Sequence, residues 1–566
     1  MEKIWLKHYE EGVPHTIEIP DKTMYDLLVD AAKEHPERTA VSFFGKKISF
    51  GQLLNAVDQF ATALYDLGVR KGTKVAIILP NLPQYPMVHY AIMKLGGILV
   101  PTNPLYVERE IQYQLSDSGA EYLIVLNLLF PRIQRVWKDT PLKKVIVTGV
   151  KEYLPGILKL LYPIKEKKEG THVKVEPQEN VYFFQDLMKK KFPAPPESKI
   201  APEEIAIFMY TGGTTGVLKG AVLTHRNVVA NVLQTREWMR DLHHGNQKIL
   251  SALPFFHSYG MTTCLHLFVA SRSTAVLVPR FDVKQVLKTI QKEQITIFPG
   301  VPTMYVAINN FPDVQKYNVK SIKACISGGA ALPVEVQREF ERITGGKLVE
   351  GYGLSEASPV THANPIYGLR KEGSIGLPFP STEARIVDPE SLKELPVGEV
   401  GELVVKGPQV MKEYWNKPDE TSQVLHDGWL FTGDMAKVDE DGYFYIVDRK
   451  KDMIIASGFN IYPREVEEVL FQHPKIKEAA VAGVPDPYRG ETVKAYIVLK
   501  EGESATADEI IDFCKERLAK FKVPKLVEFR EDLPKSLIGK VLRRVLVEED
   551  KKKMAEEAKK KAGEKK

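Results

Sequence analysis

Short apolar runs alternate with longer amphipathic stretches through most of this chain. Runs rich in β-branched residues at Lys74–Leu79 and Glu121–Leu126 predict buried strands. The stretches Phe50–Leu67 and Tyr85–Leu95 repeat apolar residues at helical spacing and predict helices. Strands that alternate with helices in this way favour a parallel sheet covered by helices. The pattern therefore predicts an α/β fold built in layers.

The same alternation continues through Thr274–Val278, Val283–Glu293 and Thr296–Phe298, and then the pattern changes. A hairpin is expected to turn at Asp441-Gly442, because Asp-Gly between apolar runs is a strong turn signal. A compact α+β pattern follows it, with helices at Pro463–Leu470 and Ala507–Leu518 and strands at Glu478–Val484 and Thr492–Leu499. We therefore expect a large N-terminal domain of layered α/β subdomains over residues 1–447, a hinge at 448–452 and a small α+β domain over 453–566.

Composition agrees with a globular protein of more than one domain. The chain has 566 residues, more than one hydrophobic core usually organises. Its residues are 44% hydrophobic and 27% charged, the balance of an ordinary globular protein. A net charge of +5 does not indicate nucleic acid as a partner. Three scattered cysteines without metal spacing suggest neither a disulfide framework nor a zinc site. No apolar run approaches the ~18 residues needed to cross a bilayer, and the N-terminus lacks a signal-peptide pattern. A cytoplasmic location is expected.

Two segments stand apart from the alternating pattern. Gly149–Lys191 holds an apolar stretch, Leu154–Ile164, followed by the basic run Lys165–Lys168. It predicts a surface insertion with one amphipathic helix, and the alternative is contact with a membrane surface. The tail Lys551–Lys566 is rich in Lys, Glu and Ala, which indicates a solvated helix or a disordered end.

A loop rich in glycine and threonine is the first candidate for chemistry. Tyr210-Thr-Gly-Gly-Thr-Thr-Gly-Val-Leu-Lys-Gly220 follows the apolar run Ile205–Met209. Glycines let backbone N–H groups point inward and hydroxyls add donors, so the loop predicts an anion-binding nest, with Lys219 as an added positive charge. It is not a Walker P-loop, because Lys219 neither follows Gly216 directly nor precedes Ser or Thr. The alternative is a flexible surface turn.

Four further motifs follow in order. They are Val349-Glu-Gly-Tyr-Gly-Leu-Ser-Glu356, Asp427-Gly-Trp-Leu-Phe-Thr-Gly-Asp434, Val447–Asn460 and Leu533-Pro-Lys-Ser-Leu-Ile-Gly-Lys540. Each is weak alone. Together with the glycine-rich loop, over nearly the whole chain, they resemble the adenylate-forming superfamily of acyl-CoA synthetases, luciferases and peptide-synthetase adenylation domains. Many members carry Ser at the position of Gly212. The form of the motif with glycine there resembles the branch of bacterial long-chain fatty acid–CoA ligases.

The resemblance implies a two-step reaction. Members of the family form an acyl-adenylate and pyrophosphate from a carboxylic acid and ATP, and then exchange AMP for coenzyme A. Charge on the α-phosphate requires cations and N–H donors, and Lys540 matches the family's invariant lysine. Glu356 matches the magnesium ligand, since Mg²⁺ prefers carboxylate oxygen, phosphate and water. Thr211 is expected beside the metal. Without these motifs Lys540 would be an ordinary surface lysine and Glu356 a helix-terminal acid.

The resemblance also assigns the nucleotide contacts. Tyr352 offers an aromatic face to adenine, although a core aromatic is the plain alternative. Asp434 matches the acceptor of both ribose hydroxyls, with Arg449 as its basic partner. The full set expected to bind the nucleotide or coenzyme A is Thr211, Gly212, Gly213, Thr214, Thr215, Gly216, Lys219, Gly329, Ala330, Tyr352, Ser355, Asp434, Arg449, Lys451, Gly458 and Phe459.

The hinge and the acyl pocket come from the same resemblance. In the family, the small C-terminal domain rotates between the two half-reactions. Lys451 matches the pivot, and Gly458 and Phe459 would line a coenzyme A tunnel. His257, within Pro254-Phe-Phe-His-Ser-Tyr-Gly260, would lie near the carboxylate, and a packed core histidine is the alternative. The expected catalytic residues are Lys540, Glu356 and His257.

Long-chain fatty acid, ATP, Mg²⁺ and coenzyme A are therefore the expected substrates and cofactors. Three alternatives remain open: the same chemistry on a short-chain, medium-chain or aromatic acid, transfer of acyl-AMP to a carrier protein, and a nucleotide-binding relative without catalysis. Nucleic acid is not expected as a partner. The sequence leaves the oligomeric state open, with a homodimer among the options, and also leaves open a peripheral contact with the inner face of the cell membrane.

Overall fold

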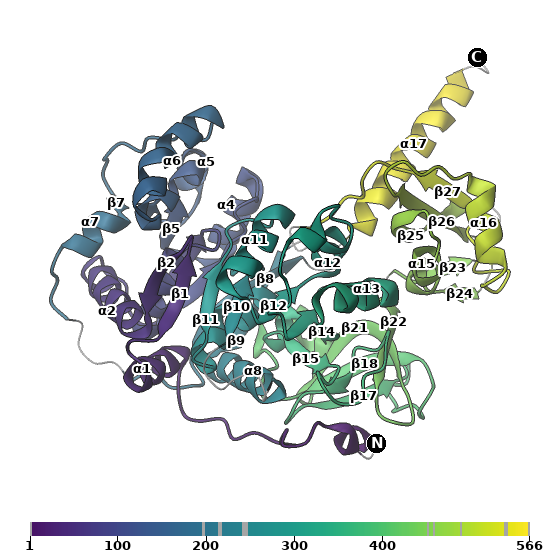
Figure 1. The fold of residues 1–566 in the computed structure, drawn as a ribbon, viewed down its shortest axis with the longest axis horizontal. Coiled ribbons are helices and arrows are strands. Elements are labelled where there is room, and N and C mark those ends of the chain that lie inside the picture. Colours follow the sequence, from purple (N-terminus) through teal and green to yellow (C-terminus); the bar gives the residue numbers. More distant parts are fainter. Residues whose placement is uncertain are drawn as a thin grey trace.

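The described chain divides into a large N-terminal part and a small C-terminal part. The computed structural model describes residues 3–194, 199–212, 218–239, 247–449, 452–456, 459–486, 490–536 and 541–563. These residues form four β-sheets, three before residue 450 and one after residue 452. In Figure 1 the C-terminal part lies at the upper right, and its last helix, α17, points away from the rest of the molecule.

An eight-stranded sheet carries the glycine-rich hairpin. Its strand order is β19-β9-β8-β4-β3-β5-β6-β7; the strands from β8 to β7 are parallel, and β9 and β19 join in antiparallel pairs. Successive residues of β3 point to opposite faces: Val75 and Ile77 join one hydrophobic core, while Ala76 and Ile78 join another. Both faces are covered by helices, which explains why these strands are continuous apolar runs. The strands are β3 (Lys74–Ile78), β4 (Ile98–Pro101), β5 (Tyr122–Leu126), β6 (Lys144–Thr148), β7 (Val181–Phe183), β8 (Ile205–Gly212), β9 (Leu218–Thr224) and β19 (Glu413–Tyr414).

A nine-stranded sheet packs beside it, in the order β16-β15-β14-β13-β12-β10-β11-β1-β2. Helices α11, α12 and α13 connect its successive parallel strands, as the alternating sequence pattern predicts. Its strands are β1 (Thr39–Phe43), β2 (Lys46–Ser49), β10 (Lys248–Ser251), β11 (Thr274–Leu277), β12 (Ile297–Gly300), β13 (Ala324–Ser327), β14 (Lys347–Gly353), β15 (Val360–Ala363) and β16 (Leu377–Pro378).

Two smaller sheets complete the described fold. One contains β17 (Glu383–Val387), β18 (Gly401–Lys406), β20 (Leu425–His426), β21 (Trp429–Val438) and β22 (Phe444–Arg449). The other contains β23 (Ile454–Ala456), β24 (Phe459–Ile461), β25 (Ile476–Asp486), β26 (Gly490–Leu499) and β27 (Leu526–Phe529). The buried hydrophobic clusters of the C-terminal part contain only residues from Ile454 onward. The expected boundary at 448–452 agrees with this division and stays a prediction.

Local sequence signals account for several helix starts. Thr23, Ser49 and Thr224 each accept a hydrogen bond from the backbone three residues on and form capping boxes at α1, α2 and α8. The α-helices are α1 (Met24–Glu34), α2 (Phe50–Asp66), α3 (Gln84–Lys94), α4 (Glu108–Ser118), α5 (Phe130–Val136), α6 (Gly156–Lys168), α7 (Phe184–Lys189), α8 (His225–Trp238), α9 (Ser258–Gly260), α10 (Leu267–Ala270), α11 (Val283–Glu293), α12 (Pro302–Asn309), α13 (Val334–Thr344), α14 (Pro418–Val424), α15 (Pro463–Phe471), α16 (Ala507–Lys515) and α17 (Arg543–Gly563). A π-helix, Met261–His266, joins α9 to α10.

The predicted layered α/β fold with a small α+β C-terminal domain is confirmed. The expectation of a simple surface insertion at Gly149–Lys191 is wrong in its second half. There, Val181–Phe183 forms β7, which pairs in parallel with β6, and α7 buries Phe184 and Leu187. Only α6 has the exposed character that the sequence predicts. Within the described ranges, no helix is both long and apolar enough to span a membrane.

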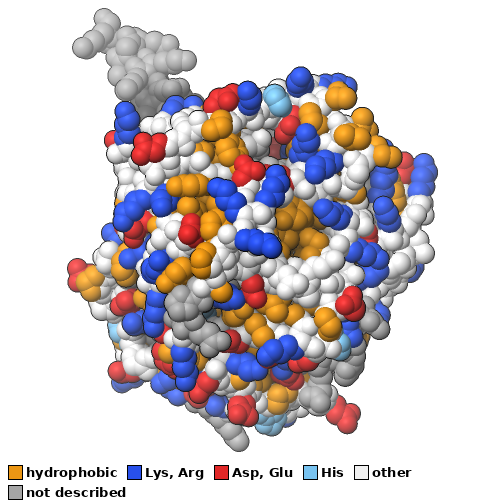
Figure 2. Space-filling view, turned by 90° about the vertical axis from the view of Figure 1, so that its left-hand side faces the viewer, with side chains coloured by type: hydrophobic (Ala, Val, Ile, Leu, Met, Phe, Trp, Pro, Cys, Tyr) orange, Lys and Arg blue, Asp and Glu red, His pale blue; other side chains and the backbone are white. Residues whose placement is uncertain are grey.

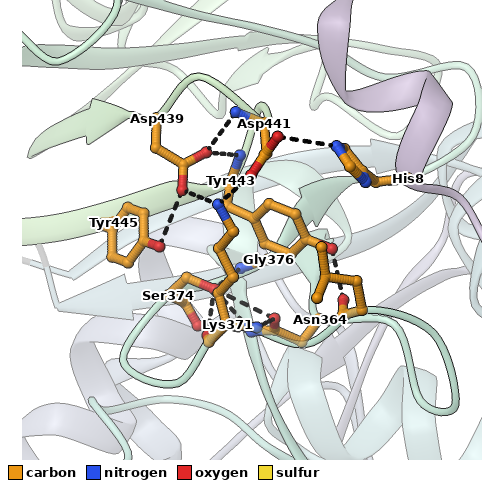
Figure 3. A network of polar contacts seen from close by, with 10 residues as sticks. His8, Asn364, Lys371, Ser374, Gly376, Asp439, Asp441, Tyr443 and Tyr445 are labelled. Atoms are coloured by element: carbon orange, nitrogen blue, oxygen red, sulfur yellow. Dashed lines mark hydrogen bonds and ion pairs between the residues drawn. The ribbon is translucent and has the colours of Figure 1, made fainter.

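A polar network ties the loop before β16 to the turn between β21 and β22 (Figure 3). The Lys371 ammonium lies 2.6 Å from Asp439 and 2.7 Å from Asp441, so it is held by both carboxylates of the turn. This ammonium keeps the pKa of both acids below the usual range. Ser374 donates to the Lys371 carbonyl at 2.7 Å and thereby closes the loop. Ion pairs thus hold the loop against the turn. Arg464 of the C-terminal part donates to the Gly373 carbonyl of the same loop.

Candidate active site

The glycine-rich segment is the tip of a β-hairpin. Strands β8 and β9 are antiparallel, and Thr211 pairs with Lys219 while Gly212 pairs with Leu218. Both ends of the predicted loop therefore lie on strands. Residues Gly213, Thr214, Thr215 and Gly216 lie outside the described residues. The register brings the Thr211 and Lys219 backbones side by side at the base of the tip.

Glu356 lies directly beside this hairpin. It belongs to a short 3₁₀ turn, Ser355–Ala357, that follows β14. The Tyr414 hydroxyl donates to Glu356 Oε1 at 2.7 Å, and the Thr211 hydroxyl lies 3.5 Å from the same oxygen. The chain reverses tightly here: a side chain on Gly353 would lie 2.1 Å from the Pro359 carbonyl oxygen. The turn therefore requires glycine, and it aims the carboxylate at the hairpin.

Lys219 is held in place by groups of the protein itself. Its ammonium forms an ion pair with Glu420 of α14, and it lies 5.4 Å from the centre of the Tyr414 ring. Burial, together with the Glu356 carboxylate, raises the pKa of Tyr414, so this hydroxyl stays protonated and donates. Tyr414 thus contacts both the predicted metal ligand and the predicted phosphate lysine.

A second pair of predicted residues meets at the end of β14. The Tyr352 hydroxyl donates to Asp434 Oδ2 at 2.6 Å. Asp434 pairs in turn with Arg449 across the antiparallel strands β21 and β22. The backbone of Arg449 is thereby placed, while its side chain lies outside the described part of the molecule. An aromatic ring beside a carboxylate provides a stacking face next to a two-oxygen acceptor, the combination that a nucleoside requires.

The His257 segment contacts the Glu356 turn and strand β13. Ser258 and Ser355 lie 3.0 Å apart through their hydroxyl oxygens, which links α9 to the Glu356 turn. Tyr259 donates to the Ile326 carbonyl at 2.7 Å, and a side chain on Gly328 would lie 3.1 Å from the Tyr259 ring. His257 is half-buried at the start of α9, where its Nδ1 accepts from the Tyr259 backbone at 3.3 Å.

The glycine pair after β13 is open to solvent on one side. Gly329 has a positive φ of 80° and is exposed, and Ala330 is half-exposed beside it. The left-handed backbone favours glycine and turns the chain away from the sheet, which leaves main chain accessible at the strand end. The carboxyl ends of parallel strands are where α/β proteins bind ligands. This position fits the predicted approach to the base.

Several predicted residues fall in parts of the chain that the structure does not describe. Lys540, Lys451 and Gly458 lie outside the described residues, and Phe459 is described only as the first residue of strand β24. Sequence reasoning missed Tyr414, Glu420 and Ser258, all of which contact predicted residues. Tyr414 stands in a two-residue strand that carries no periodic signal. The run Glu413-Tyr-Trp415 before a helix start was the available hint.

The donor set fits one magnesium ion held jointly with a nucleotide. No group of three His, Cys, Asp or Glu side chains able to hold a metal occurs among the residues that the structure covers. Mg²⁺ typically takes one or two protein carboxylates and completes its shell with phosphate oxygens and water. Glu356 supplies one such carboxylate beside a hydroxyl and a lysine. The site therefore fits a metal that arrives with phosphates.

Fold and site together define a nucleotide-binding α/β enzyme with a small C-terminal domain. The chain belongs to the AMP-binding enzyme family: the family model matches residues 28–415, and the model of the AMP-binding enzyme C-terminal domain matches residues 465–540. A long-chain-fatty-acid–CoA ligase of Bacillus subtilis strain 168 is 50% identical over 551 residues, covering 97% of this chain and 98% of that protein.

Solved structures agree with the family. The anthranilate CoA ligase AuaEII in complex with anthranoyl-AMP is similar with a TM-score of 0.85 and 28% identity, over 95% of this chain and 99% of that one. ATP-bound MatB from Rhodopseudomonas palustris is similar with a TM-score of 0.82 and 29% identity, over 94% of this chain and 99% of that one. Both similarities extend through the small C-terminal domain.

Proposed function

We propose that this enzyme activates a long-chain fatty acid with ATP and transfers the acyl group to coenzyme A. In the first step a carboxylate oxygen of the acid forms a bond to the α-phosphorus, and the bond from that phosphorus to pyrophosphate breaks. In the second step the thiol sulfur of coenzyme A bonds to the acyl carbon, AMP leaves with the carbon–oxygen electron pair, and the thiol proton goes to solvent. The 50% sequence identity to a ligase of this kind, over 97% of this chain, supports the proposal.

The observation that carries the proposal is the cluster at the hairpin base. Thr211 and Lys219 of the hairpin meet Glu356 and Tyr414 there, two residues from more distant parts of the chain. When bound, Mg²⁺ would neutralise phosphate charge and polarise the phosphoryl oxygens. Glu356 is proposed to hold it, and Lys219 is proposed to bind the pyrophosphate end of ATP. The cluster suits adenylyl transfer with release of pyrophosphate, because it combines a cation, hydroxyls and a carboxylate that can bind a hard metal ion.

The nucleoside is proposed to lie along the end of β14. Tyr352 would stack on adenine, while Gly329 and Ala330 would bring main chain to its edge. Asp434 would accept the ribose hydroxyls, with its carboxylate oriented by the Tyr352 hydroxyl at 2.6 Å. Ser355 would donate to the α-phosphate. This order, from base to ribose to phosphate, would run toward the hairpin base.

The second half-reaction is proposed to use the C-terminal domain. Lys540 would reach the α-phosphate during adenylate formation, and rotation at residues 448–452 about Lys451 would withdraw it. Gly458 and Phe459 would then line the path of coenzyme A past His257. The separate hydrophobic core of the C-terminal part supports its movement as a unit.

The decisive experiment measures pyrophosphate release and thioester formation across acids from acetate to oleate, with aromatic acids included. Oleate or palmitate should give the highest kcat/KM. A maximum at a medium-chain or aromatic acid would move the enzyme to that substrate class. Release of pyrophosphate without any acyl-CoA, followed by labelling of an added carrier protein, would support the acyl-AMP transfer alternative. No product from any acid would refute the ligase proposal.

We also propose that this enzyme contacts a membrane surface peripherally through α6, from the cytoplasmic side. Ile157, Leu160, Leu161 and Ile164 follow helical spacing, and their side chains are 76%, 78%, 52% and 66% exposed. An apolar stripe that faces water is unusual, because helices normally turn such a stripe to the core. Lysines at the C-terminal end of the helix favour an anionic surface.

The surface around α6 supports the same view. Figure 2 shows the face that carries the left-hand elements of Figure 1, where hydrophobic side chains lie among Lys and Arg side chains, with Asp and Glu side chains between them. A vesicle containing phosphatidylglycerol matches this combination, since the apolar stripe can enter the headgroup boundary while the ammonium groups stay at the phosphates. A fatty acid dissolved in that layer would be close to the enzyme.

Co-sedimentation with such vesicles tests this contact. The double variant Leu160→Ser/Ile164→Ser should lose most of the binding, and Leu105→Ser, at a residue 64% exposed away from α6, should not. Vesicles of neutral lipid should bind less, and salt should weaken the interaction. Equal binding by all three proteins would leave α6 as a plain surface helix.

A further inference from the structure

The Lys219 ammonium lies between a carboxylate and an aromatic ring rather than in open solvent. Glu420, in the first turn of α14, pairs with its ammonium directly. On the other side, the Tyr414 ring lies 5.4 Å from the same ammonium, and its hydroxyl bonds to Glu356. The Lys219 side chain is only 13% exposed. The lysine proposed to bind the pyrophosphate end of ATP is therefore already paired with a carboxylate of the protein.

Glu420 is held firmly where it contacts this lysine. The hydroxyl of its neighbour Thr421 accepts from the Tyr414 backbone at 2.9 Å and donates to the Lys417 carbonyl at 2.8 Å. Tyr414 itself pairs with Ala221 across β19 and β9, two residues from Lys219. These bonds anchor the start of α14 to β19, next to the strand that carries Lys219. The backbone position from which Glu420 reaches the lysine is thereby fixed.

We propose that Glu420 is a positioning residue that competes with phosphate for Lys219 and so weakens the binding of the pyrophosphate product. This inference rests on the proposed function, because it assumes that pyrophosphate forms at the hairpin. It deepens that function by assigning a residue to product release. Glu420 would not touch the reacting atoms, and it would act only through Lys219.

The physical reason is an exchange of ion pairs. Lys219 can bind phosphate oxygens only if it gives up part of its attraction to Glu420, and the carboxylate then remains beside a multiply charged anion. Both effects oppose anion binding. They act on ATP and on pyrophosphate alike. ATP, however, has further contacts through base and ribose, while pyrophosphate depends on this end of the site alone. Both lose affinity by a similar factor, and pyrophosphate, which lacks those contacts, is left the more weakly bound of the two.

The test compares Glu420→Gln with Asp419→Asn. Each variant removes one negative charge, from adjacent positions in the first turn of α14, and Asp419 is exposed. Titration calorimetry with magnesium pyrophosphate, without acid or ATP, reads the affinity directly. Glu420→Gln should bind pyrophosphate about tenfold more tightly, and Asp419→Asn should bind it like the unmodified enzyme. Inhibition of turnover by added pyrophosphate should strengthen in the same proportion.

A double-mutant cycle separates competition from general electrostatics. In a Lys219→Ala background, Glu420→Gln should no longer tighten binding beyond the effect of Asp419→Asn, because the shared partner is gone. Unchanged or weaker pyrophosphate binding by Glu420→Gln alone would overturn the proposal and make Glu420 a residue that merely orders Lys219. A gain in affinity cannot result from misfolding, and thermal unfolding of each variant checks this further.

Failure of the proposed function would look different. If the unmodified enzyme forms no acyl-CoA from any acid yet binds pyrophosphate more tightly after Glu420→Gln, the competition stands and the ligase assignment falls. If it forms acyl-CoA but all variants bind pyrophosphate equally, the ligase assignment stands and the role of Glu420 falls.

Discussion

The Arg464 guanidinium lies 3.5 Å from the Glu350 carboxylate, across the boundary between the two parts of the chain. Both side chains are buried, with exposed fractions of 9% and 6%. Arg464 also donates to the Ile446 carbonyl at 3.0 Å and to the Gly373 carbonyl at 3.4 Å. Its backbone N–H donates to Asp448 at 2.9 Å. One residue at the start of α15 therefore attaches the C-terminal domain to β14 and to the loop that Lys371 fixes.

Replacing Arg464 should loosen this attachment. Arg464→Met leaves the Glu350 carboxylate buried without its cation, and removal of one partner from a buried pair costs about 3 kcal/mol. We expect a lower midpoint for thermal unfolding of the full chain and faster proteolysis after residue 449. The matched control is Arg517→Met, which removes an exposed arginine of the same domain that pairs with its neighbour Glu516. Similar losses in both variants would contradict a docking role.

The pair of Glu350 and Arg464 also predicts that the stability of the protein depends on pH. Burial raises the pKa of Glu350 to about 7 from its usual 4.5, and Arg464 opposes part of this rise. Because the pKa is raised on folding, the stability that Glu350 contributes is complete below pH 4.5 and is lost as the pH passes through 7, at roughly 1.4 kcal/mol per unit. Arg464→Met should therefore be more harmful at pH 8 than at pH 5.5. Chemical denaturation at both pH values measures this, and equal losses would refute it.

Removing the Tyr352 hydroxyl should affect nucleotide binding and leave stacking intact. Tyr352→Phe keeps the ring but frees Asp434 from its 2.6 Å hydrogen bond, so the carboxylate is less well oriented for the ribose. We expect AMP to bind more weakly by about 1 kcal/mol, or about fivefold. Tyr25→Phe is the control, since the hydroxyl of Tyr25 in α1 donates to Asp58 in α2 at 2.9 Å, and neither residue belongs to this site. Calorimetry with AMP measures both, and an unchanged affinity for Tyr352→Phe would argue against the nucleoside placement.

Neutralising Glu356 should weaken magnesium binding and slow adenylate formation. Glu356→Gln keeps the acceptor for the Tyr414 hydroxyl but loses the charge that a hard cation requires. Pyrophosphate exchange should fall on the order of 100-fold, with a higher magnesium concentration needed for half-maximal rate. Glu413→Gln, one residue before Tyr414 in β19, is the control for a charge change nearby. A normal magnesium profile in Glu356→Gln would remove it from the metal site.

Lys540 is predicted to act in one half-reaction only. Lys540→Ala should slow adenylate formation on the order of 100-fold, because a cation at the α-phosphate is lost. Consumption of a supplied acyl-adenylate by coenzyme A should continue at a near-normal rate. Both steps can be followed separately by pyrophosphate exchange and thioester formation. Equal loss in the two steps would contradict the assigned role.

The sequence by itself determined the kinds of elements, their order and the types of residue at the site. Apolar periodicity is a local signal, so it predicted α2 and α11 within one or two residues and the parallel layers they imply. Family motifs supplied Thr211, Glu356 and Asp434 as candidates. Both kinds of information are carried by residues close together along the chain.

Only the tertiary structure decided which of these residues meet, and through what. Tyr414 and Glu420 belong to the site because the two-residue strand β19 pairs with β9 at the edge of the sheet, next to the hairpin. Arg464 contacts Glu350 because α15 docks on β14 from another domain. Such contacts depend on strand order and domain docking, which arise from burial summed over the whole molecule. A strand of two residues, or a single arginine among many, carries no local pattern from which its partner could be predicted.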